Sequence, residues 1–413
     1  MHSNEILALG LGIEPPWRLV DQRLDTAASP NVLHLTVAAD RGAAFACPTC
    51  GRSCKAHDFQ EFTWRHLNFF QHHCHITARV PRVHCPEHGV HRATVPWARE
   101  GSRFTLLFEQ AAMMLVREMP VLAAARLMEI TDKRLWRIVT HYVDQAVAAL
   151  DLSDLKAFGL DETAAKRGHT YVTVFIDLDR PDKPVVFVTP GRGKDTVARF
   201  RDHLAEHGGE PGRVVEVVSD MSGAFIASVR EVVPEASVTV DWFHVVQTFT
   251  KALDAVRRAE AKSTRLPKAL RWAVLKNADG PLTDKQADAL AELEACGHAT
   301  GEAWRIKEKL RWVRKAETAQ AARWRLTHFL RHARDIIADK DLLKPMQGAL
   351  ATLDKHAERI LQRWTSGHST ARLEGLNGLF QAARARERGY RNATTFTAMI
   401  YLIGAPIRVF VST

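Results

Sequence analysis

Two short cysteine motifs near the start of the chain constrain its folding more than any other feature. The sequence reads Cys-Pro-Thr-Cys-Gly at Cys47–Gly51 and Cys-Pro-Glu-His-Gly at Cys85–Gly89. Each motif offers two metal ligands, and the glycine after the second ligand lets the backbone turn so that its amides can approach sulfur. Two such knuckles together make a tetrahedral zinc site. The sequence therefore predicts a zinc ribbon with a structural ion on Cys47, Cys50, Cys85 and His88.

The distribution of the other cysteines supports a local metal site. Five of the six cysteines fall within the first ninety residues or so, which favours metal binding over a chain-wide disulfide framework. Cys54 and His57 form another pair with knuckle spacing, so an alternative ligand set remains open, namely Cys47, Cys50, Cys54 and His57. Either set closes the zinc with four protein ligands, which makes the site structural and not catalytic. Cys296 stands alone, and we expect it to be a buried thiol.

Length and charge suggest several domains and a polyanionic partner. A single core rarely grows beyond about 250–300 residues, so a chain of 413 residues should contain more than one domain. The chain carries 57 Lys and Arg against 47 Asp and Glu, a surplus that favours binding to nucleic acid. We find no apolar run long enough to span a membrane and no signal peptide, so we expect a cytoplasmic protein without a membrane partner.

A helix-turn-helix is predicted in the segment 119–143. An Ala-rich helix is followed by a break at Glu129–Thr131 and then by a second helix, for which Thr131 is a suitable N-cap. In a helix-turn-helix the second helix enters the major groove of DNA, where its early side chains contact bases and phosphates. The candidate DNA-binding residues of this helix are Lys133, Arg134 and Arg137. A plain hairpin of two helices remains the alternative.

The region 155–245 alternates strands and helices. The runs around residues 155–162, 169–179, 184–190, 213–220 and 237–246 are short, apolar and β-branched, as strands of a covered sheet are. Residues 194–209 between the third and fourth runs have the spacing of an amphipathic helix. The resulting order β-β-β-α-β-α-β-α is that of a ribonuclease-H-like domain. From about residue 245 to 365 the sequence has no strand signal, which predicts an all-helical insertion.

Two aspartates end apolar strand runs in this region. Asp161 closes the first run and Asp220 closes the fourth, where a carboxylate is expensive to bury without a cation. The first and fourth strands are neighbours in a ribonuclease-H-like sheet, so the two carboxylates should meet at one metal site. Glu374, on a helix after the insertion, is the candidate third carboxylate. Phosphodiester chemistry needs two divalent ions, and carboxylates are the ligands that Mg²⁺ accepts.

Further residues are candidates for supporting roles around these carboxylates. We expect Asp241 and His244 to orient the metal ligands or the DNA. Asn377 lies one helical turn after Glu374 and shares its face. Downstream arginines suit phosphate binding, and the candidates for this role are Arg384, Arg386 and Arg391.

Taken together, these motifs resemble the ISL-three family of bacterial insertion-sequence transposases. The resemblance rests on the CPTCG and CPEHG knuckles, the helix-turn-helix, and the segments GLDE, VVSDMS, VDWFHVV, ARLEGLN and RERGYRN, which follow one another in the order of the family. It implies a DDE triad at Asp161, Asp220 and Glu374, a helical insertion before the glutamate, and binding to terminal inverted repeats. The family's second knuckle ends in cysteine or histidine, so His88 is compatible with it.

We therefore predict a multidomain α+β protein. The expected parts are a zinc-ribbon head at 1–97, a helix-turn-helix at 98–150, a ribonuclease-H-like α/β catalytic domain at 151–245 and 366–413, and an all-helical insertion at 246–365. The expected activity is metal-dependent cleavage and strand transfer with two Mg²⁺ ions, for which Mn²⁺ can substitute. The partners would be double-stranded transposon ends and target DNA, bound by a homodimer or larger assembly in the nucleoid.

Two other functions remain open at this point. A non-catalytic DNA-binding regulator or domesticated relative would keep the fold without the activity. A structure-selective nuclease of the same fold would cleave without preference for a repeat sequence.

Overall fold

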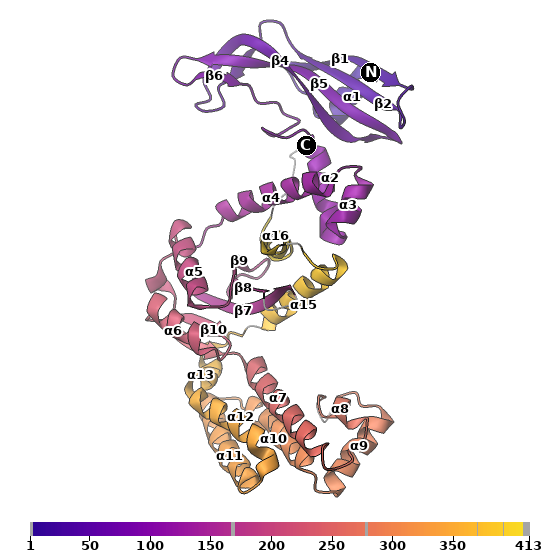
Figure 1. The fold of residues 1–413 in the computed structure, drawn as a ribbon. Helices are drawn as coiled ribbons and strands as arrows, with labels where there is room; N and C mark the ends of the chain where they lie inside the picture. Colours follow the sequence, from indigo (N-terminus) through magenta and orange to yellow (C-terminus); the bar gives the residue numbers. More distant parts are fainter. Residues whose placement is uncertain (1–2, 167–169, 277–279, 370, 391, 408–413) are drawn as a thin grey trace. The chain divides into compact units, whose positions relative to one another are not determined.

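The computed structural model describes residues 3–166, 170–276, 280–369, 371–390 and 392–407 (Figure 1). The chain divides into two compact units. The first comprises Met1–Tyr142 with Ile407–Thr413, and the second comprises Val143–Pro406.

The first unit contains a six-stranded sheet. Its order is β1-β2-β5-β4-β3, with β6 paired to β5. Strands β2 and β5 are parallel, and the other pairs are antiparallel. Alternate side chains of β2 and β5, such as Leu35 and Ile76, are buried in one core, as expected of a sheet with one covered face. The strands are β1 (Trp17–Asp25), β2 (Val32–Ala39), β3 (Ala44–Ala46), β4 (Ser53–Phe69), β5 (His72–Cys85) and β6 (Gly89–Arg92).

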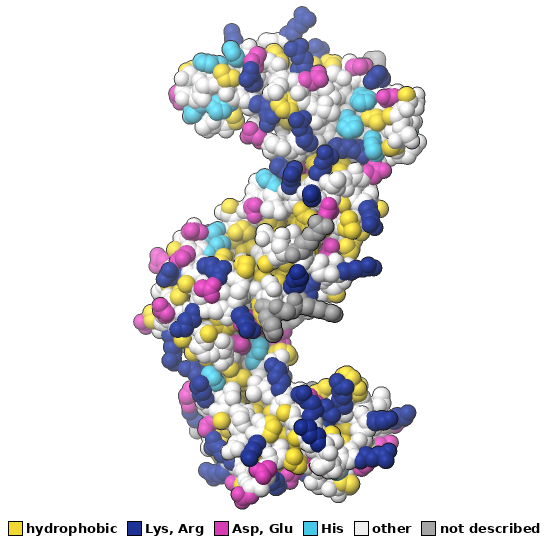
Figure 2. Space-filling view, in the orientation of Figure 1, with side chains coloured by type: hydrophobic (Ala, Val, Ile, Leu, Met, Phe, Trp, Pro, Cys, Tyr) yellow, Lys and Arg dark blue, Asp and Glu magenta, His cyan; other side chains and the backbone are white. Residues whose placement is uncertain are grey.

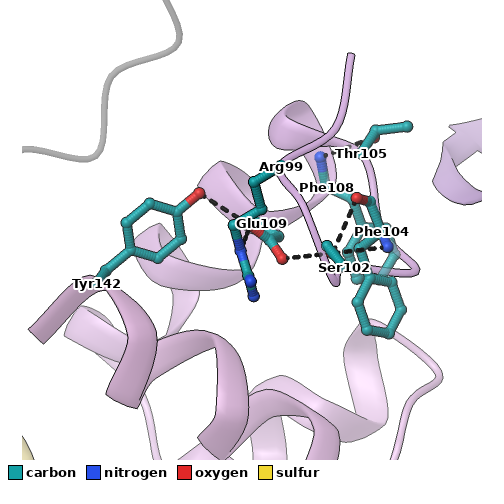
Figure 3. A network of polar contacts seen from close by, with 7 residues as sticks. All are labelled: Arg99, Ser102, Phe104, Thr105, Phe108, Glu109 and Tyr142. Carbon is teal, nitrogen blue, oxygen red and sulfur yellow. Dashed lines mark hydrogen bonds and ion pairs between the residues drawn. The ribbon is translucent and has the colours of Figure 1, made fainter. Parts of the chain in front are cut away.

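In the first unit, the buried carboxylate of Glu109 on α2 connects this helix to the loop before it and to α4. Glu109 is fully buried and accepts hydrogen bonds from Arg99 Nε at 2.9 Å, Ser102 Oγ at 2.8 Å and Tyr142 Oη at 2.9 Å (Figure 3). Burial and the neighbouring charge of Glu109 raise the pKa of Tyr142 well above its usual range, so the phenol remains a donor. The helices are α1 (Ser3–Gly10), α2 (Leu106–Glu118), α3 (Val121–Leu127) and α4 (Asp132–Ala148), and the boundary between the two units falls within α4.

The second unit is built on a five-stranded sheet with the order β11-β10-β7-β8-β9. Strands β7, β8 and β9 are antiparallel, whereas β10 and β11 run parallel to β7. The fourth strand of the unit therefore lies beside the first, as the sequence predicts. The strands are β7 (Ala157–Lys166), β8 (Thr170–Asp177), β9 (Val185–Pro190), β10 (Glu216–Ser219) and β11 (Ser237–Val240).

Helices cover both faces of this sheet (Figure 1). On one face, Phe158 and Leu160 of β7 share a core with Phe200 of α5 and Phe225 of α6. On the other face, α15 and α16 pack against β7, β8 and β9. The bounds of these helices are α5 (Lys194–Glu206), α6 (Gly223–Val232), α15 (Ala371–Arg386) and α16 (Ala393–Gly404), and a short 3₁₀ turn, η1 (Pro211–Arg213), precedes β10.

The segment between β11 and α15 contains helices in its described residues. They pack around a core that includes Phe249, Leu253, Leu310 and Phe329. Capping is visible at the start of α7, where Asp241 accepts a hydrogen bond from Phe243 N at 2.8 Å. The elements are α7 (Trp242–Glu260), α8 (Leu270–Ala273), α9 (Asp284–Ala295), α10 (Ala299–Arg314), α11 (Ala319–Ile337), η2 (Asp341–Leu343), α12 (Lys344–Lys355), α13 (Ala357–Leu361) and α14 (Arg363–Ser366).

Two local expectations from the sequence are wrong. The first strand of the second unit does not end at Asp161, because β7 continues to Lys166 as one arm of a hairpin with β8. Cys296 is exposed and not buried, since it is the C-cap of α9 and precedes a turn at Gly297.

Candidate metal centres and nucleic-acid interface

The two cysteine knuckles lie at adjacent turns of the first unit. One follows β3 and the other joins β5 to β6, and Gly51 and Gly89 each adopt a positive φ, at 74° and 76°. The N–H groups of Cys50 and Thr49 lower the pKa of Cys47, which favours the thiolate that a metal needs. The turns therefore bring four ligand atoms within 4.8 Å of one another, those of Cys47, Cys50, Cys85 and His88.

The spacing of these atoms fits zinc. The Sγ atoms of Cys50 and Cys85 are 3.7 Å apart, and Cys85 Sγ is 3.5 Å from His88 Nδ1. Tetrahedral bonds to zinc would separate two sulfur atoms by about 3.8 Å and a sulfur from a nitrogen by about 3.6 Å. Cys54 is not one of these four ligands, and its Sγ donates to the carbonyl of Arg52. The geometry thus selects the first of the two ligand sets considered from the sequence.

A second group of potential ligands is occupied by hydrogen bonds. His203, Glu206 and His207 also bring ligand atoms within 4.8 Å of one another. However, His203 Nε2 pairs with the carbonyl of Val186, and both ring nitrogens of His207 pair with backbone carbonyls. These contacts leave too few free donor atoms for a metal, so the group stabilises α5.

The predicted helix-turn-helix corresponds to α3 and α4. Thr131 Oγ1 accepts from Arg134 N at 3.4 Å, which places it at the N-cap of α4 as expected. Leu135 faces the core, while the three basic side chains of the first turns are exposed, namely Lys133, Arg134 and Arg137. This end of α4 is therefore accessible to a polyanion.

Three aspartates lie where the parallel pairing of neighbouring strands ends: Asp220 and Asp241 directly follow β10 and β11, and Asp161 lies within β7 just beyond its pairing with β10. Val218 pairs with Gly159, so the register of β10 and β7 sets Asp220 opposite Asp161 two residues later. Ser219 pairs with Val240, so the next residues of β10 and β11 are Asp220 and Asp241. The three carboxylates therefore gather at one edge of the sheet.

Helix α15 adds the fourth carboxylate. Asn377 Nδ2 donates to Asp161 Oδ2 at 2.8 Å, and Gln381 Nε2, one turn later, donates to Thr163 Oγ1 at 2.7 Å. Asp161 and Thr163 share one face of β7 because strand side chains alternate, whereas Glu162 follows Leu160 to the opposite face. Glu374, one turn before Asn377, is thereby directed toward the same sheet edge.

The carboxylates at this edge shift one another's pKa values. Burial and the charges of Asp241 and Asp161 raise the pKa of Glu374 to about 7. Burial also raises the pKa of Asp161, and the charges of Asp220 and Asp241 add to this effect, while His244, 3.9 Å away, opposes it. Glu374 Oε1 is buried without a hydrogen-bond partner. Such crowding of acidic groups is unfavourable unless protons or cations neutralise it.

The carboxylates of Asp161, Asp220 and Glu374 do not form one tight cluster of ligand atoms. Among the described residues, Asp161, Asp220 and Glu374 do not form a group whose ligand atoms all lie within 4.8 Å of one another. Two ions about 3.5–4 Å apart would be held from opposite sides, so outer ligands of such a pair lie further apart than those of a single ion.

Residues other than the predicted ligands also lie around this edge. Burial and the charge of Asp220 raise the pKa of Glu162 to about 7, and Arg192 opposes this. His368 hydrogen-bonds Glu216 and Asp179, which fixes the chain just before α15. Because His368 is distant in sequence from Glu216 and Asp179, no local pattern in the sequence indicates these contacts.

The arginines after Glu374 differ in availability. Arg384 is half-buried and donates to the carbonyl of Ala164 at 2.7 Å, so it ties α15 to β7 and is less available to phosphate than expected. Arg386 is exposed. Arg391 lies outside the described residues.

Models of known families match most of the chain. Residues 158–400 match the model of the ISL3 DDE transposase domain. The chain belongs to the ISL3 transposase family. Residues 93–143 match the helix-turn-helix domain of transposase family ISL3, and residues 43–88 match the zinc finger of the transposases of IS204, IS1001, IS1096 and IS1165.

Relatives of this ISL3 transposase are also insertion-sequence transposases. The transposase of IS1557 from Mycobacterium tuberculosis is 30% identical over 298 residues, which cover 65% of this chain and 66% of the relative. The transposase of IS1001 from Bordetella parapertussis is 26% identical over 367 residues, which cover 85% and 86%. No helix in the described part of this family member has the length and apolar character needed to cross a membrane.

Proposed function

We propose that this ISL3 family member cleaves and joins DNA at the ends of an insertion sequence by a metal-dependent DDE mechanism. The observation that carries the proposal is the gathering of Asp161, Asp220 and Glu374 at one sheet edge, where one carboxylate oxygen of the half-buried Glu374, Oε1, has no hydrogen-bond partner among the described residues. The order of the sheet, three antiparallel strands followed by two parallel ones, supports a ribonuclease-H-like catalytic domain. The helical segment after β11 is then the insertion, and the domain limits predicted from the sequence remain predictions.

The chain's own residues would prepare the site for chemistry. Asp161 is held at both oxygens, by Glu162 N at 2.8 Å and by Asn377 at 2.8 Å, so its carboxylate is fixed in orientation. Ser222 N donates to Asp220 Oδ1 at 2.8 Å and fixes the second carboxylate. A pair of Mg²⁺ ions bound to Asp161, Asp220 and Glu374 would activate the attacking oxygen and stabilise the leaving oxygen.

The positions of other groups suggest supporting roles. His244 would balance the negative charge of Asp161, and Asp241, which caps α7, would adjust the charge of Glu374. Water would attack first and a 3′-hydroxyl second, so no Ser or Tyr nucleophile is required. The zinc ribbon and the exposed end of α4 would recognise terminal inverted repeats, and pairing of two ends would require a dimer or larger assembly.

Cleavage of the element's own ends tests this function. Asp161→Asn should abolish nicking of a duplex that carries the terminal repeat in Mg²⁺ or Mn²⁺, while binding of the same duplex is retained. Asp182→Asn, at an exposed position of the same unit, is the matched control and should cleave normally. Unchanged cleavage by Asp161→Asn would reject the mechanism. Binding without cleavage by the unaltered protein would favour a non-catalytic regulator, and cleavage of any sequence would favour a structure-selective nuclease.

A further inference from the structure

A pocket of about 530 Å³ opens beside Glu374. Its walls come from the start of α7, the last turns of α10, and the segment that leads into α15. Its volume lies within the range of about 300–1,000 Å³ that is typical of ligand sites. Because Glu374 and Asp241 belong to its lining, the pocket is continuous with the carboxylate edge of the sheet. The basic side chains in the lining are Lys307, Arg311, Arg314, Lys315 and Arg363.

Two of these five cations are already engaged within the protein. Lys307 is buried and donates to the carbonyls of Val274 and Lys276 at 3.0 Å, so it has a structural role. Arg311 is paired with Glu308 at 3.5 Å.

In the described chain, the other three cations have no acidic partner within 4.0 Å. Two of them, Arg314 and Lys315, are exposed at the end of α10, and Figure 2 shows how Lys and Arg gather over the helices of this unit. None of the three is buried, so none needs a buried ion-pair partner. The three side chains Arg314, Lys315 and Arg363 are therefore available to bind phosphate.

An aromatic ring lies in the same pocket. Phe243 is in the first turn of α7 and its side chain is 47% exposed, although the adjacent Trp242 is buried. A large apolar ring that lines a polar pocket offers a surface on which a base can stack. A protein segment or a small anion would use only one of the two features, whereas a nucleotide uses both the ring and the cations.

We propose that this pocket binds a single unpaired nucleotide of the DNA strand next to the cleavage point, with its base stacked on Phe243 and its phosphates on Arg314, Lys315 and Arg363. This inference rests on the proposed function, because it takes the adjoining carboxylates as the site of cleavage. The duplex would open at its junction with the element, which separates the strand to be cut from its complement. The ligand class is single-stranded DNA, without a requirement for base identity.

Binding of short single-stranded oligonucleotides to the full-length protein tests the pocket without any cleavage. Fluorescence anisotropy in buffer free of divalent metal should show about tenfold weaker binding for Phe243→Leu, whereas Phe243→Trp should bind like the unaltered protein. Leucine would satisfy a merely apolar role, so the contrast isolates stacking. Arg314→Gln should reduce the slope of log affinity against log salt by about 0.7, the contribution of one phosphate contact on a single strand.

Matched controls lie on the same helix. Trp312→Leu and Arg305→Gln change exposed residues of α10 outside the pocket lining and should leave binding and slope unchanged. Equal binding by Phe243→Leu and Trp312→Leu, with an unaltered slope for Arg314→Gln, would overturn the proposal. Thermal melting of each variant identifies any that fails to fold, and Arg314→Gln, at an exposed position, provides the second independent readout.

The position of the nucleotide can be mapped on a transposon end. A fluorescent adenine analogue placed at successive positions should brighten next to the expected cleavage point when the Asp161→Asn protein binds without cutting. This signal should disappear with the double variant that carries both Asp161→Asn and Phe243→Leu. A uniformly quenched analogue would show a closed duplex and reject the unpaired nucleotide. If Asp161→Asn still cleaves, the chemistry fails while the oligonucleotide result stands, so the two failures are distinguishable.

Discussion

Asn377 donates a hydrogen bond of 2.8 Å to Asp161 Oδ2, and this contact joins helix α15 to strand β7 across more than half of the chain. The other amide atom, Asn377 Oδ1, is buried without a partner in the described structure. The side chain of Asn377 therefore orients Asp161 and, with Gln381 and Arg384, ties the helix that carries Glu374 to β7. Groups that orient metal ligands in this way affect both affinity and activity.

Asn377→Ala should lower the rate of end cleavage by about 10–100-fold and raise the Mg²⁺ concentration needed for half-maximal cleavage. The physical reason is that Asp161 loses its fixed orientation while all proposed ligands remain. Cleavage assays across a metal titration measure both effects. Leu379→Ala, an exposed position on the same helix, serves as the control. Equal metal requirements for the two variants would show that the hydrogen bond does not position the ligand.

The zinc ribbon gives a second prediction. Purified protein should contain about one zinc ion per chain by mass spectrometry, and Cys85→Ser should lose the ion and unfold the surrounding turns, because a closed zinc site contributes directly to folding. Cys54→Ala should retain the zinc, since its thiol donates to the carbonyl of Arg52 and Cys54 is not one of the four grouped ligands. Loss of zinc from Cys54→Ala with retention in Cys85→Ser would instead support the alternative ligand set.

These sites differ in how far the sequence could predict them. Asp220 and the knuckles were recognisable because each follows a short local pattern, an apolar run before a carboxylate or two ligands before a glycine. The order of β7 and β10 followed from the order of the strands along the chain. Asp161 was identified, but the end of its strand was not, because the pairing of Thr163 with Val172 of β8 depends on a hairpin and not on the apolar run.

Other features depend on contacts between distant residues. Nothing near Glu109 in the sequence indicates that Arg99 and Tyr142 meet it in the fold. Similarly, the basic character of Arg384 suggested phosphate binding, but its hydrogen bond to Ala164 is visible only once α15 lies on β7. The sequence gives the chemical type of each side chain, whereas its hydrogen-bond partner depends on how distant segments pack in the fold.

The Glu109 network leads to a stability prediction. Glu109→Ala should lower the free energy of unfolding of the first unit by about 3–5 kcal/mol, because it leaves the guanidinium of Arg99 without its buried partner. Hydrogen exchange of the α2 amides measures this unit separately from the other. Glu100→Ala, whose side chain is 81% exposed, should change exchange little. Similar exchange rates in both variants would show that the network does not stabilise the helices.

A pH dependence is expected at His368, which is joined to Glu216 at 2.7 Å and to Asp179 at 3.0 Å. Burial lowers the pKa of His368, but the hydrogen bonds to the two carboxylates outweigh it, and the net pKa is raised. Both carboxylates accept, so both ring nitrogens donate only when the imidazole is protonated. The stabilisation is thus fully present below the unfolded pKa near 6.5 and is lost as pH rises through the higher folded pKa.

His368→Gln should therefore lower the melting temperature of the second unit by about 2–4 °C at pH 6, and the difference from the unaltered protein should shrink at higher pH. Since His368 precedes the helix that carries Glu374, the same variant should lower end cleavage most near pH 6. His332→Gln, at an exposed position, provides a comparison whose effect on melting should not vary with pH. A melting difference for His368→Gln that grows with pH would mean that the imidazole is held neutral, contrary to the contacts with Glu216 and Asp179.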